Sequence, residues 1–275
     1  MIDLHCHLLP GIDDGPPDLP RALEMARIAA GDGIRVVACT PHIYPGLYDN
    51  DATGIRIAVD ALRGALLDAD IALELVCGAD VHLEPGLAAG VACGRVATLA
   101  GSRYLLLEPP HHSMPPGFEQ SIFELMAAGL TPVITHPERL TWVEAHYHVF
   151  ARLVKRGCWM QVTSGALTGR FGPRVRYMAD RFIAEGKAHL LATDAHDPTR
   201  RPPLLAEGRR AAARLIGEVQ AGYLVEERPA WILADRDPSS ALLPEPAAGT
   251  RSADGKGWGP EWFKRLVRRH NSPLV

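Results

Sequence analysis

The chain has 275 residues, of which 47% are hydrophobic and 22% are charged. This composition is ordinary for a globular protein, and a chain of this length buries one large core, so we expect one domain with a short tail. The net charge of −3 provides no basic surplus for nucleic acid or an anionic membrane. No apolar run is long enough to span a membrane, and no signal-type leader is recognisable. Five widely spaced cysteines favour a reducing compartment, so we expect a cytoplasmic protein.

Short apolar segments alternate with stretches that have helical periodicity. The apolar segments are rich in Val, Ile and Leu, which is typical of parallel strands buried on both faces. They cover residues 2–4, 34–39, 71–77, 104–108, 131–135, 158–163 and 188–192. Between the first two segments, Leu19, Leu23 and Ala26 show helical spacing, and Gly33 follows the expected helix end. Repeated strand–helix units predict an α/β barrel of about seven units.

The composition changes near the C-terminus. From about residue 235, Asp, Pro, Ser and Gly become frequent, which is typical of a linker. A basic segment with Trp258, Trp262 and Phe263 follows. We therefore predict a barrel over residues 1–234 and a linker with a tail over residues 235–275. The tail is either a helix or frayed end on its own domain, or an anchor for a partner chain or second subunit.

Metal-ligating side chains follow nearly every predicted strand. They are His5, His7, His42, Asp80, Glu108, His136, Asp194 and His196. The carboxyl ends of parallel barrel strands converge on one face, where the active sites of such barrels lie. His5 and His7 are two residues apart, so both point to one side of their strand. A single histidine in such a place is more often structural, but this convergence predicts a metal site.

The residue types of this set indicate the metal and the chemistry. Nitrogen and carboxylate ligands without cysteine suit Zn, Mn or Fe. The set exceeds what one ion needs, which implies two or three ions with a bridging carboxylate. Clustered ions are typical of enzymes that hydrolyse phosphate esters or amides with a metal-activated water. A cysteine-based phosphatase is excluded, because no Arg stands six positions after any of the five cysteines.

Motifs along the whole predicted barrel match those of a known family. They are DLHCHLLPGIDDGP from residue 3, TPH at 40–42, GAD at 78–80, LLLEPP at 105–110, THPERL at 135–140, QVTSGAL at 161–167 and TDAHDPTRRPP at 193–203. This ordered set resembles the polymerase and histidinol phosphatase (PHP) domains, and within them the manganese-dependent protein-tyrosine phosphatases of bacterial capsule and exopolysaccharide clusters. The resemblance implies a distorted (β/α)7, TIM-like barrel of the PHP type with a short C-terminal tail.

The resemblance also implies how the metal ligands are grouped. The assignments are His5, His7 and Asp194 to one ion, Asp14, His42 and His196 to a second, and His136 to a third, with Asp80 and Glu108 completing and bridging these sites. The motif favours Asp14 over Asp13, whose alternative is a loop or cap residue. The family more usually has Glu at position 80, so the shorter Asp80 leaves the bridging distance and the occupancy of one site open.

Two arginines complete the implied site. Arg139 follows His136 by three residues, and we prefer Arg201 to Arg200 because it directly precedes two prolines. Arginine presents a planar fork that fits two phosphate oxygens, so both residues would bind the substrate phosphate and act in catalysis. Without the motif, a surface salt bridge would explain either side chain equally well.

The resemblance implies a phosphoric monoester hydrolase, a protein-tyrosine phosphatase in which a metal-activated water attacks phosphorus. The implied cofactors are two or three divalent ions, Mn²⁺ first, with Fe or Zn as alternatives. The implied partner is a phosphotyrosine protein, a bacterial tyrosine autokinase that regulates capsular or exopolysaccharide synthesis. Neither nucleic-acid binding nor membrane insertion is expected. The sequence is compatible with a homo-oligomer but does not specify one.

Other functions compete with this interpretation. A PHP phosphatase of a small ester such as histidinol phosphate is one, and a catalytically impaired kinase-binding module is another. Amidohydrolases also open with H-x-H, but they usually carry a bridging Lys where this chain has Glu108. His111 and His112 either line the rim of the site or lie in a solvated loop. No role is assigned to the remaining histidines, which are His82, His146, His148, His189 and His270.

Overall fold

The computed structural model describes residues 1–241 and 243–247, and all paired strands within them run parallel. The strands are β1 (Ile2–Cys6), β2 (Val36–Cys39), β3 (His42–Ile43), β4 (Glu74–Cys77), β5 (Asp80–His82), β6 (Tyr104–Glu108), β7 (Thr131–Thr135), β8 (Trp159–Thr163) and β9 (Leu190–Ala192). They form two sheets, in the orders β1-β2-β4 and β3-β5-β6-β7-β8-β9. Each of the predicted strand segments overlaps one strand, whereas the short strands β3 and β5 lie outside the predicted segments.

The two sheets close into one distorted barrel. After Thr40 and Pro41, the chain of β2 continues as β3, and β4 likewise continues as β5. Pro41 interrupts the ladder because it has no backbone N–H to donate. At the other edge, the backbone N–H of His7 donates to the carbonyl oxygen of Ala195 at 2.9 Å, which joins the ends of β1 and β9. The predicted α/β barrel is therefore confirmed, with breaks in two of its strands.

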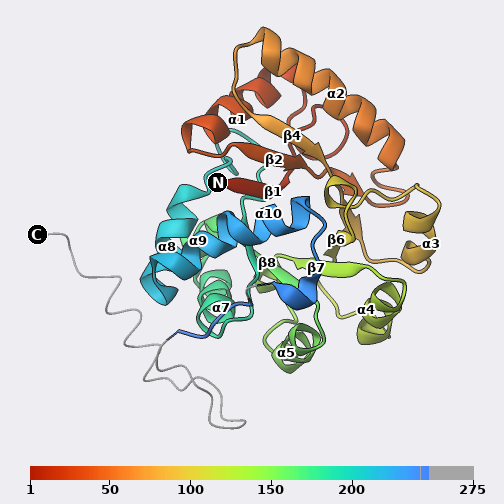
Figure 1. Ribbon diagram of the computed structural model, residues 1–275, viewed down its shortest axis with the longest axis vertical. Helices are drawn as coiled ribbons and strands as arrows, with labels where there is room; N and C mark the ends of the chain where they lie inside the picture. The colour runs from red at the N-terminus through yellow and green to blue at the C-terminus, as the bar shows by residue number, and fades with distance from the viewer. Residues whose placement is uncertain (242, 248–275) are drawn as a thin grey trace, which may run out of the picture.

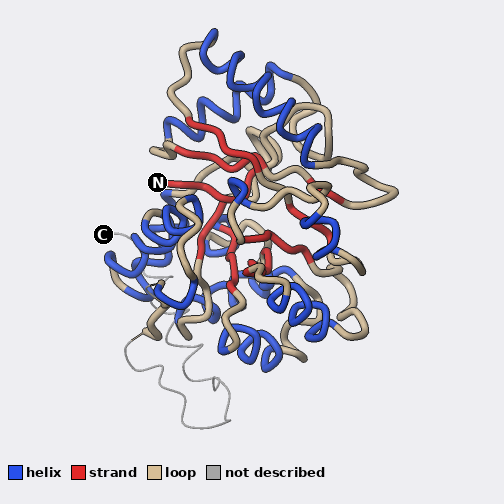
Figure 2. Tube along the Cα trace, turned by 45° about the vertical axis from the view of Figure 1, so that its right-hand side comes forward, coloured by secondary structure: helices blue, strands red, loops and turns tan. Residues whose placement is uncertain are grey.

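Helices surround the strands, as Figures 1 and 2 show. They are α1 (Leu19–Gly31), α2 (Ala52–Asp68), α3 (Leu87–Ala92), α4 (Phe118–Ala127), α5 (Tyr147–Lys155), α6 (Ser164–Leu167), α7 (Pro173–Ala184), α8 (Ala206–Ile216), α9 (Glu218–Val225) and α10 (Glu227–Leu233). Asp18 caps α1 by accepting a hydrogen bond from the backbone N–H of Arg21. Among the residues that the structure describes, no helix is both long and apolar enough to cross a membrane.

Alternation along the strands separates the barrel interior from the layer beneath the helices. In β6, Tyr104 and Leu106 belong to the interior cluster, whereas Leu105 and Leu107 pack in the outer one. Glu108 follows in the inward register, and it is buried. In β6 the interior is thus apolar toward the amino end of the strand, and the polar side chain lies at the carboxyl end.

The amino ends of the strands are closed by the C-terminal part of the described chain. Ile232 of α10 belongs to the interior cluster, and α10 crosses the strands in Figure 1. Beyond α10, the backbone N–H of Arg103 donates to Asp235 at 2.8 Å, and the hydroxyl of Tyr104 donates to the carbonyl oxygen of Arg236 at 2.8 Å. The first residues of the predicted linker therefore pack on the barrel. The predicted basic aromatic tail lies outside the described residues.

Candidate metal centre

The side chains predicted from the strand ends meet at the carboxyl face of the barrel. The Nε2 atoms of His5 and His7 are 3.3 Å apart, and Asp194 Oδ1 lies 3.4 Å from the first and 3.7 Å from the second. All three residues are buried. The structure thus brings together the first ligand group that the resemblance implies.

The second implied group is equally compact. Asp14 Oδ1 lies 3.3 Å from His196 Nε2 and 3.6 Å from His42 Nε2. His7 joins this group, and one ligand atom from each of the four residues lies within 4.8 Å of the others. His7 therefore stands between the first two groups. Burial and the neighbouring rings of His196 and His42 hold the pKa of His7 well below its usual range. The ring is therefore neutral, and one of its nitrogens has a lone pair available to a cation.

Asp80 lies at the centre of the site. Its Oδ2 is 3.5 Å from both His5 Nε2 and His42 Nδ1, and 4.0 Å from His136 Nε2. The side chain is fully buried, yet neither carboxylate oxygen has a hydrogen-bond partner among the described residues. A buried carboxylate without partners is costly unless a cation satisfies it. The residues present therefore fit divalent metal ions, and Asp80 lies between the histidines of different ligand groups.

The third group surrounds Glu108. Its Oε1 lies 3.6 Å from the Nε2 of His136, the residue that the resemblance assigns to the third ion, and 3.0 Å from His111 Nε2. His82 Nδ1 is 4.0 Å from Glu108 Oε2. Burial alone would raise the pKa of Glu108, but hydrogen bonding to His111 and His82 lowers it below its usual range. The carboxylate is therefore charged and ready to bind a cation.

Sequence reasoning assigned no role to His82, although a signal for it exists. His82 follows Asp80 by two residues in β5, the same spacing as His5 and His7, so it points to the same side of its strand. Its ring stacks on Tyr44, with ring centroids 3.9 Å apart and an interplanar angle of 3°. The alternation rule that grouped the other pairs would have placed His82 at the site.

Two side chains behind the ligands orient their rings. Asp13 Oδ2 lies 2.7 Å from His7 Nδ1 and accepts from the backbone N–H of His42 at 3.1 Å. Gln161 Oε1 lies 2.9 Å from His5 Nδ1. Such partners fix the Nδ1–H tautomer and leave Nε2 free for a metal ion. Asp13, for which the sequence suggested a loop or cap role, therefore also orients a candidate ligand.

Two of the candidate ligands have a strained backbone. His136 has φ 32° and Asp194 has φ 50°, which is the left-handed region that residues with a side chain rarely adopt. His136 directly follows the last residue of β7, and Asp194 is the second residue after β9. Strain of this kind persists where the surrounding structure enforces it, typically at functional sites.

Both predicted arginines reach the site. Arg139 Nη1 contacts Asp194 Oδ2, and Arg201 Nη2 lies 2.6 Å from the same oxygen. Burial would raise the pKa of Asp194, but Arg201 and other positive neighbours hold it well below its usual range. The guanidinium carbons of the two arginines lie 5.0 and 5.9 Å from the ring centroid of Phe171. Arg200, in contrast, is exposed and turns its backbone N–H to Asp197.

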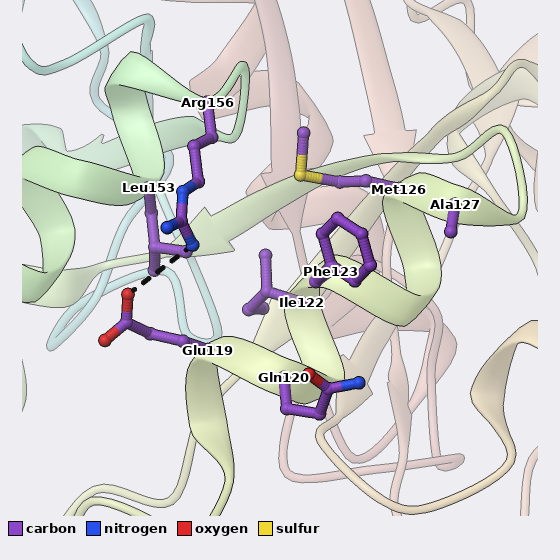
Figure 3. A pocket seen from close by; sticks show the side chains of 8 residues that line it. All are labelled: Glu119, Gln120, Ile122, Phe123, Met126, Ala127, Leu153 and Arg156. Carbon is purple, nitrogen blue, oxygen red and sulfur yellow. Dashed lines mark ion pairs between the residues drawn. The ribbon is translucent and has the colours of Figure 1, made fainter.

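The remaining candidates for chemistry lie elsewhere or are inert. Burial raises the pKa of the Cys39 and Cys158 thiols, and all five cysteines are free. His189 stacks on Trp159 inside the barrel, away from the carboxyl face. A pocket of about 730 Å³ lies between α4 and α5, and Figure 3 shows its lining by side chains such as Phe123 and Arg156. None of its lining residues is a candidate metal ligand.

Comparison with known proteins agrees with this geometry. The family model for capsular polysaccharide synthesis, CpsB/CapC, matches residues 1–234. The chain belongs to this family. It is 36% identical to the tyrosine-protein phosphatase YwqE of Bacillus subtilis over 197 residues, which are 72% of this chain and 78% of YwqE. It is 26% identical to the tyrosine-protein phosphatase CpsB of Streptococcus pneumoniae over 243 residues, or 86% and 99% of the two chains.

A solved structure extends this similarity to the fold. One chain from the crystal structures of YwqE from Bacillus subtilis and CpsB from Streptococcus pneumoniae, described as unique metal-dependent tyrosine phosphatases, matches this chain with a TM-score of 0.84 and 31% sequence identity. The match covers 90% of this chain and 98% of the other. The predicted family is therefore confirmed, and the barrel is shared with this solved relative.

Proposed function

We propose that this CpsB/CapC family member is a metal-dependent protein-tyrosine phosphatase. The observation that carries the proposal is the convergence of nine His, Asp and Glu ligands beside two arginines at one barrel face. The relatives with the same fold that are named tyrosine-protein phosphatases support the same chemistry. The proposed substrate is a phosphotyrosine protein, namely a bacterial tyrosine autokinase that regulates capsular or exopolysaccharide synthesis. The proposed location of this protein is the cytoplasm.

The proposed cofactors are two or three divalent ions, Mn²⁺ first, with Fe or Zn as alternatives. The ligands are the nine predicted residues, His5, His7, Asp14, His42, Asp80, Glu108, His136, Asp194 and His196. When bound, the ions supply a water of lowered pKa as nucleophile and offset the charge of the phosphate. Asp80 is short for a bridging acid, but its Oδ2 is equally close to His5 and His42. This geometry favours an active enzyme over an impaired kinase-binding module.

Arg139 and Arg201 would bind the phosphoryl oxygens of the substrate. Both lie at Asp194, so the carboxylate holds the two guanidinium groups side by side, and Phe171 packs beside them. Fixed donors of this kind stabilise the charge that develops on the oxygens in the transition state, and they need no rearrangement during the reaction. Tyrosine oxygen is a tolerable leaving group, because a phenol has a pKa near ~10.

Phosphate release from a phosphotyrosine peptide tests the proposal. The protein is stripped of metal with a chelator and then supplied with Mn²⁺, Fe²⁺ or Zn²⁺, with histidinol phosphate as the competing substrate. We expect activity on the peptide to vanish on stripping and to return with one of the ions, and we expect His136→Ala to abolish it. Faster turnover of histidinol phosphate would favour the small-ester phosphatase, and activity that survives stripping would overturn the metal mechanism.

A further inference from the structure

The metal site beside Glu108 has few donors of its own from the predicted set, because His42, whose Nδ1 lies 3.7 Å from Glu108 Oε2, also faces Asp14 through its Nε2 at 3.6 Å. Glu108 and His136 contribute one atom each, and Asp80 Oδ2 lies at 4.0 Å from His136 Nε2 but at 3.5 Å from both His5 and His42. Asp80 is thus displaced toward the other two ion places. Two protein donors and a distant bridge are few for an ion that takes four to six ligands.

His111 supplies a further donor at this place. Its Nε2 lies 3.0 Å from Glu108 Oε1, and its ring centroid lies 5.2 Å from that of His136. One ligand atom from each of these three residues lies within 4.8 Å of the others. Atoms that each lie about 2.1 Å from one ion, at angles between octahedral and tetrahedral values, are about 3.0 to 3.4 Å apart. The separations of 3.0 and 3.6 Å from Glu108 Oε1 are close to this range.

The loop that carries His111 is fixed to the barrel. The backbone N–H and the hydroxyl of Thr141 both donate to the carbonyl oxygen of His111, at 3.0 and 3.1 Å. The indole N–H of Trp142 donates to the carbonyl oxygen of Pro110 at 2.9 Å. The His111 side chain is therefore held over Glu108, while the neighbouring His112 is exposed and belongs to none of the candidate ligand groups.

We propose that His111 is a ligand of the metal ion that Glu108 and His136 hold. The proposal rests on the metal centre of the proposed function, and it adds an imidazole that the strand-end pattern does not contain. The competing interpretation is that His111 only donates a hydrogen bond to Glu108 and thereby orients the carboxylate. A glutamine at position 111 can donate a hydrogen bond to Glu108 but has no imidazole nitrogen. His111→Gln should therefore preserve metal binding if His111 only orients Glu108, and weaken it if His111 is a ligand.

Metal binding, measured without any substrate, separates the interpretations. The metal-free protein and its His111→Ala, His111→Gln and His112→Ala variants are titrated with Mn²⁺ by calorimetry, and retained Mn²⁺ is counted after gel filtration. We expect His111→Gln to weaken the weakest Mn²⁺ site by at least about tenfold, as His111→Ala should under either interpretation. His112→Ala is the matched control in the same loop, and it should bind Mn²⁺ as the wild type does. Melting curves of the metal-free variants check that all of them fold.

The crystal structure of the Mn²⁺-loaded wild type gives a second readout. Anomalous scattering locates the ions, and we expect His111 Nε2 at about 2.0 to 2.3 Å from one of them. A His111→Gln variant that binds Mn²⁺ like the wild type, or a nitrogen more than about 3 Å from every ion, would overturn the ligand assignment. Full Mn²⁺ binding through His111 in a protein that hydrolyses no phosphotyrosine would instead overturn only the proposed function. A wild type that takes up no Mn²⁺ would overturn both.

Discussion

The two ends of the barrel are built from the same strands but satisfy their polar atoms differently. At the amino end, Trp159 and Tyr104 pack in the interior cluster, and the hydroxyl of Tyr104 donates to the carbonyl oxygen of Arg236. At the carboxyl end, both oxygens of the buried Asp80 and the Nδ1 atom of His136 lack hydrogen-bond partners among the described residues. The closed end therefore stabilises the fold, whereas the open end keeps unsatisfied lone pairs that a cation can use.

Positive backbone φ values occur at both ends. Within the described chain, His136 and Asp194 have them among the candidate ligands of the open end, and Asp235 has one at the closed end. Strained residues cost of order 1–3 kcal/mol each and persist where the rest of the structure enforces them. At the open end the strain thus falls on candidate metal ligands, whereas the closed end is an apolar, packed cluster. The two ends should accordingly respond to different measurements, unfolding for one and binding or turnover for the other.

The largest expected effect is on stability, at the closed end. Trp159 is a fully buried interior side chain, so Trp159→Ala should lower the free energy of unfolding of the metal-free protein by about 3–5 kcal/mol. Urea denaturation measures this change. Trp231→Ala is the control, because Trp231 is only half-buried, and it should cost markedly less.

The same variant tests whether the two ends are separable. Mn²⁺ affinity of folded Trp159→Ala should stay within about twofold of the wild type, because sites without shared partners contribute nearly independently. A loss of Mn²⁺ affinity as large as that caused by removing a ligand would show that the closed end shapes the metal centre directly. The comparison between the two ends would then fail.

A smaller free-energy effect is expected at the open end, and it should be on turnover. Arg201→Ala should lower kcat on a phosphotyrosine peptide by about 10²–10³-fold, since it removes a fixed donor to the phosphoryl oxygens. Steady-state kinetics with saturating Mn²⁺ measure the change. Arg200→Ala is the matched control next along the chain, and its exposed side chain should leave kcat within about twofold. Equal losses in the two variants would contradict the assignment of Arg201.

The strands and most ligands were predictable because their signals are local. Apolar runs rich in Val, Ile and Leu mark the buried strands, and parallel strands bring their carboxyl ends together whatever the loops do. His5 and His7 could thus be placed before any coordinates. Their assignment to the same site as His196 needed only the closure of the barrel.

What escaped prediction depends on contacts between distant residues or on loop conformation. Gln161 orients His5 across 156 positions, and that pairing follows from which strands face each other. His111 reaches Glu108 because Thr141 holds its loop, and no periodicity encodes this hydrogen bond. The partnership of Asp13 with His7 likewise arises from the fold of the loop after β1. Local patterns specify elements, whereas tertiary packing specifies which side chains meet between them.

The smallest expected effect is the pH dependence of stability that His189 causes. The ring of this buried histidine stacks on Trp159 at the closed end. Burial and Arg228 lower the pKa of His189 to about 3, and its Nδ1 accepts from the backbone N–H of Met160. In the unfolded chain its pKa is about 6.5, so the unfolded state takes up the proton first as pH falls. Stability from this neutral ring is therefore present above about pH 6.5 and is lost progressively toward pH 3.

His189→Gln isolates this contribution, because the amide oxygen can accept the same backbone hydrogen bond without titrating. Between pH 6.5 and pH 5, metal-free wild type should lose about 1.6 kcal/mol more unfolding free energy than the variant, because the slope rises from half to nearly all of about 1.4 kcal/mol per pH unit as the unfolded histidine becomes protonated. Urea denaturation at the two pH values measures both losses. Because every other titratable group is the same in both proteins, the difference reports His189 alone. Equal losses would mean that His189 contributes nothing to the acid sensitivity of the fold.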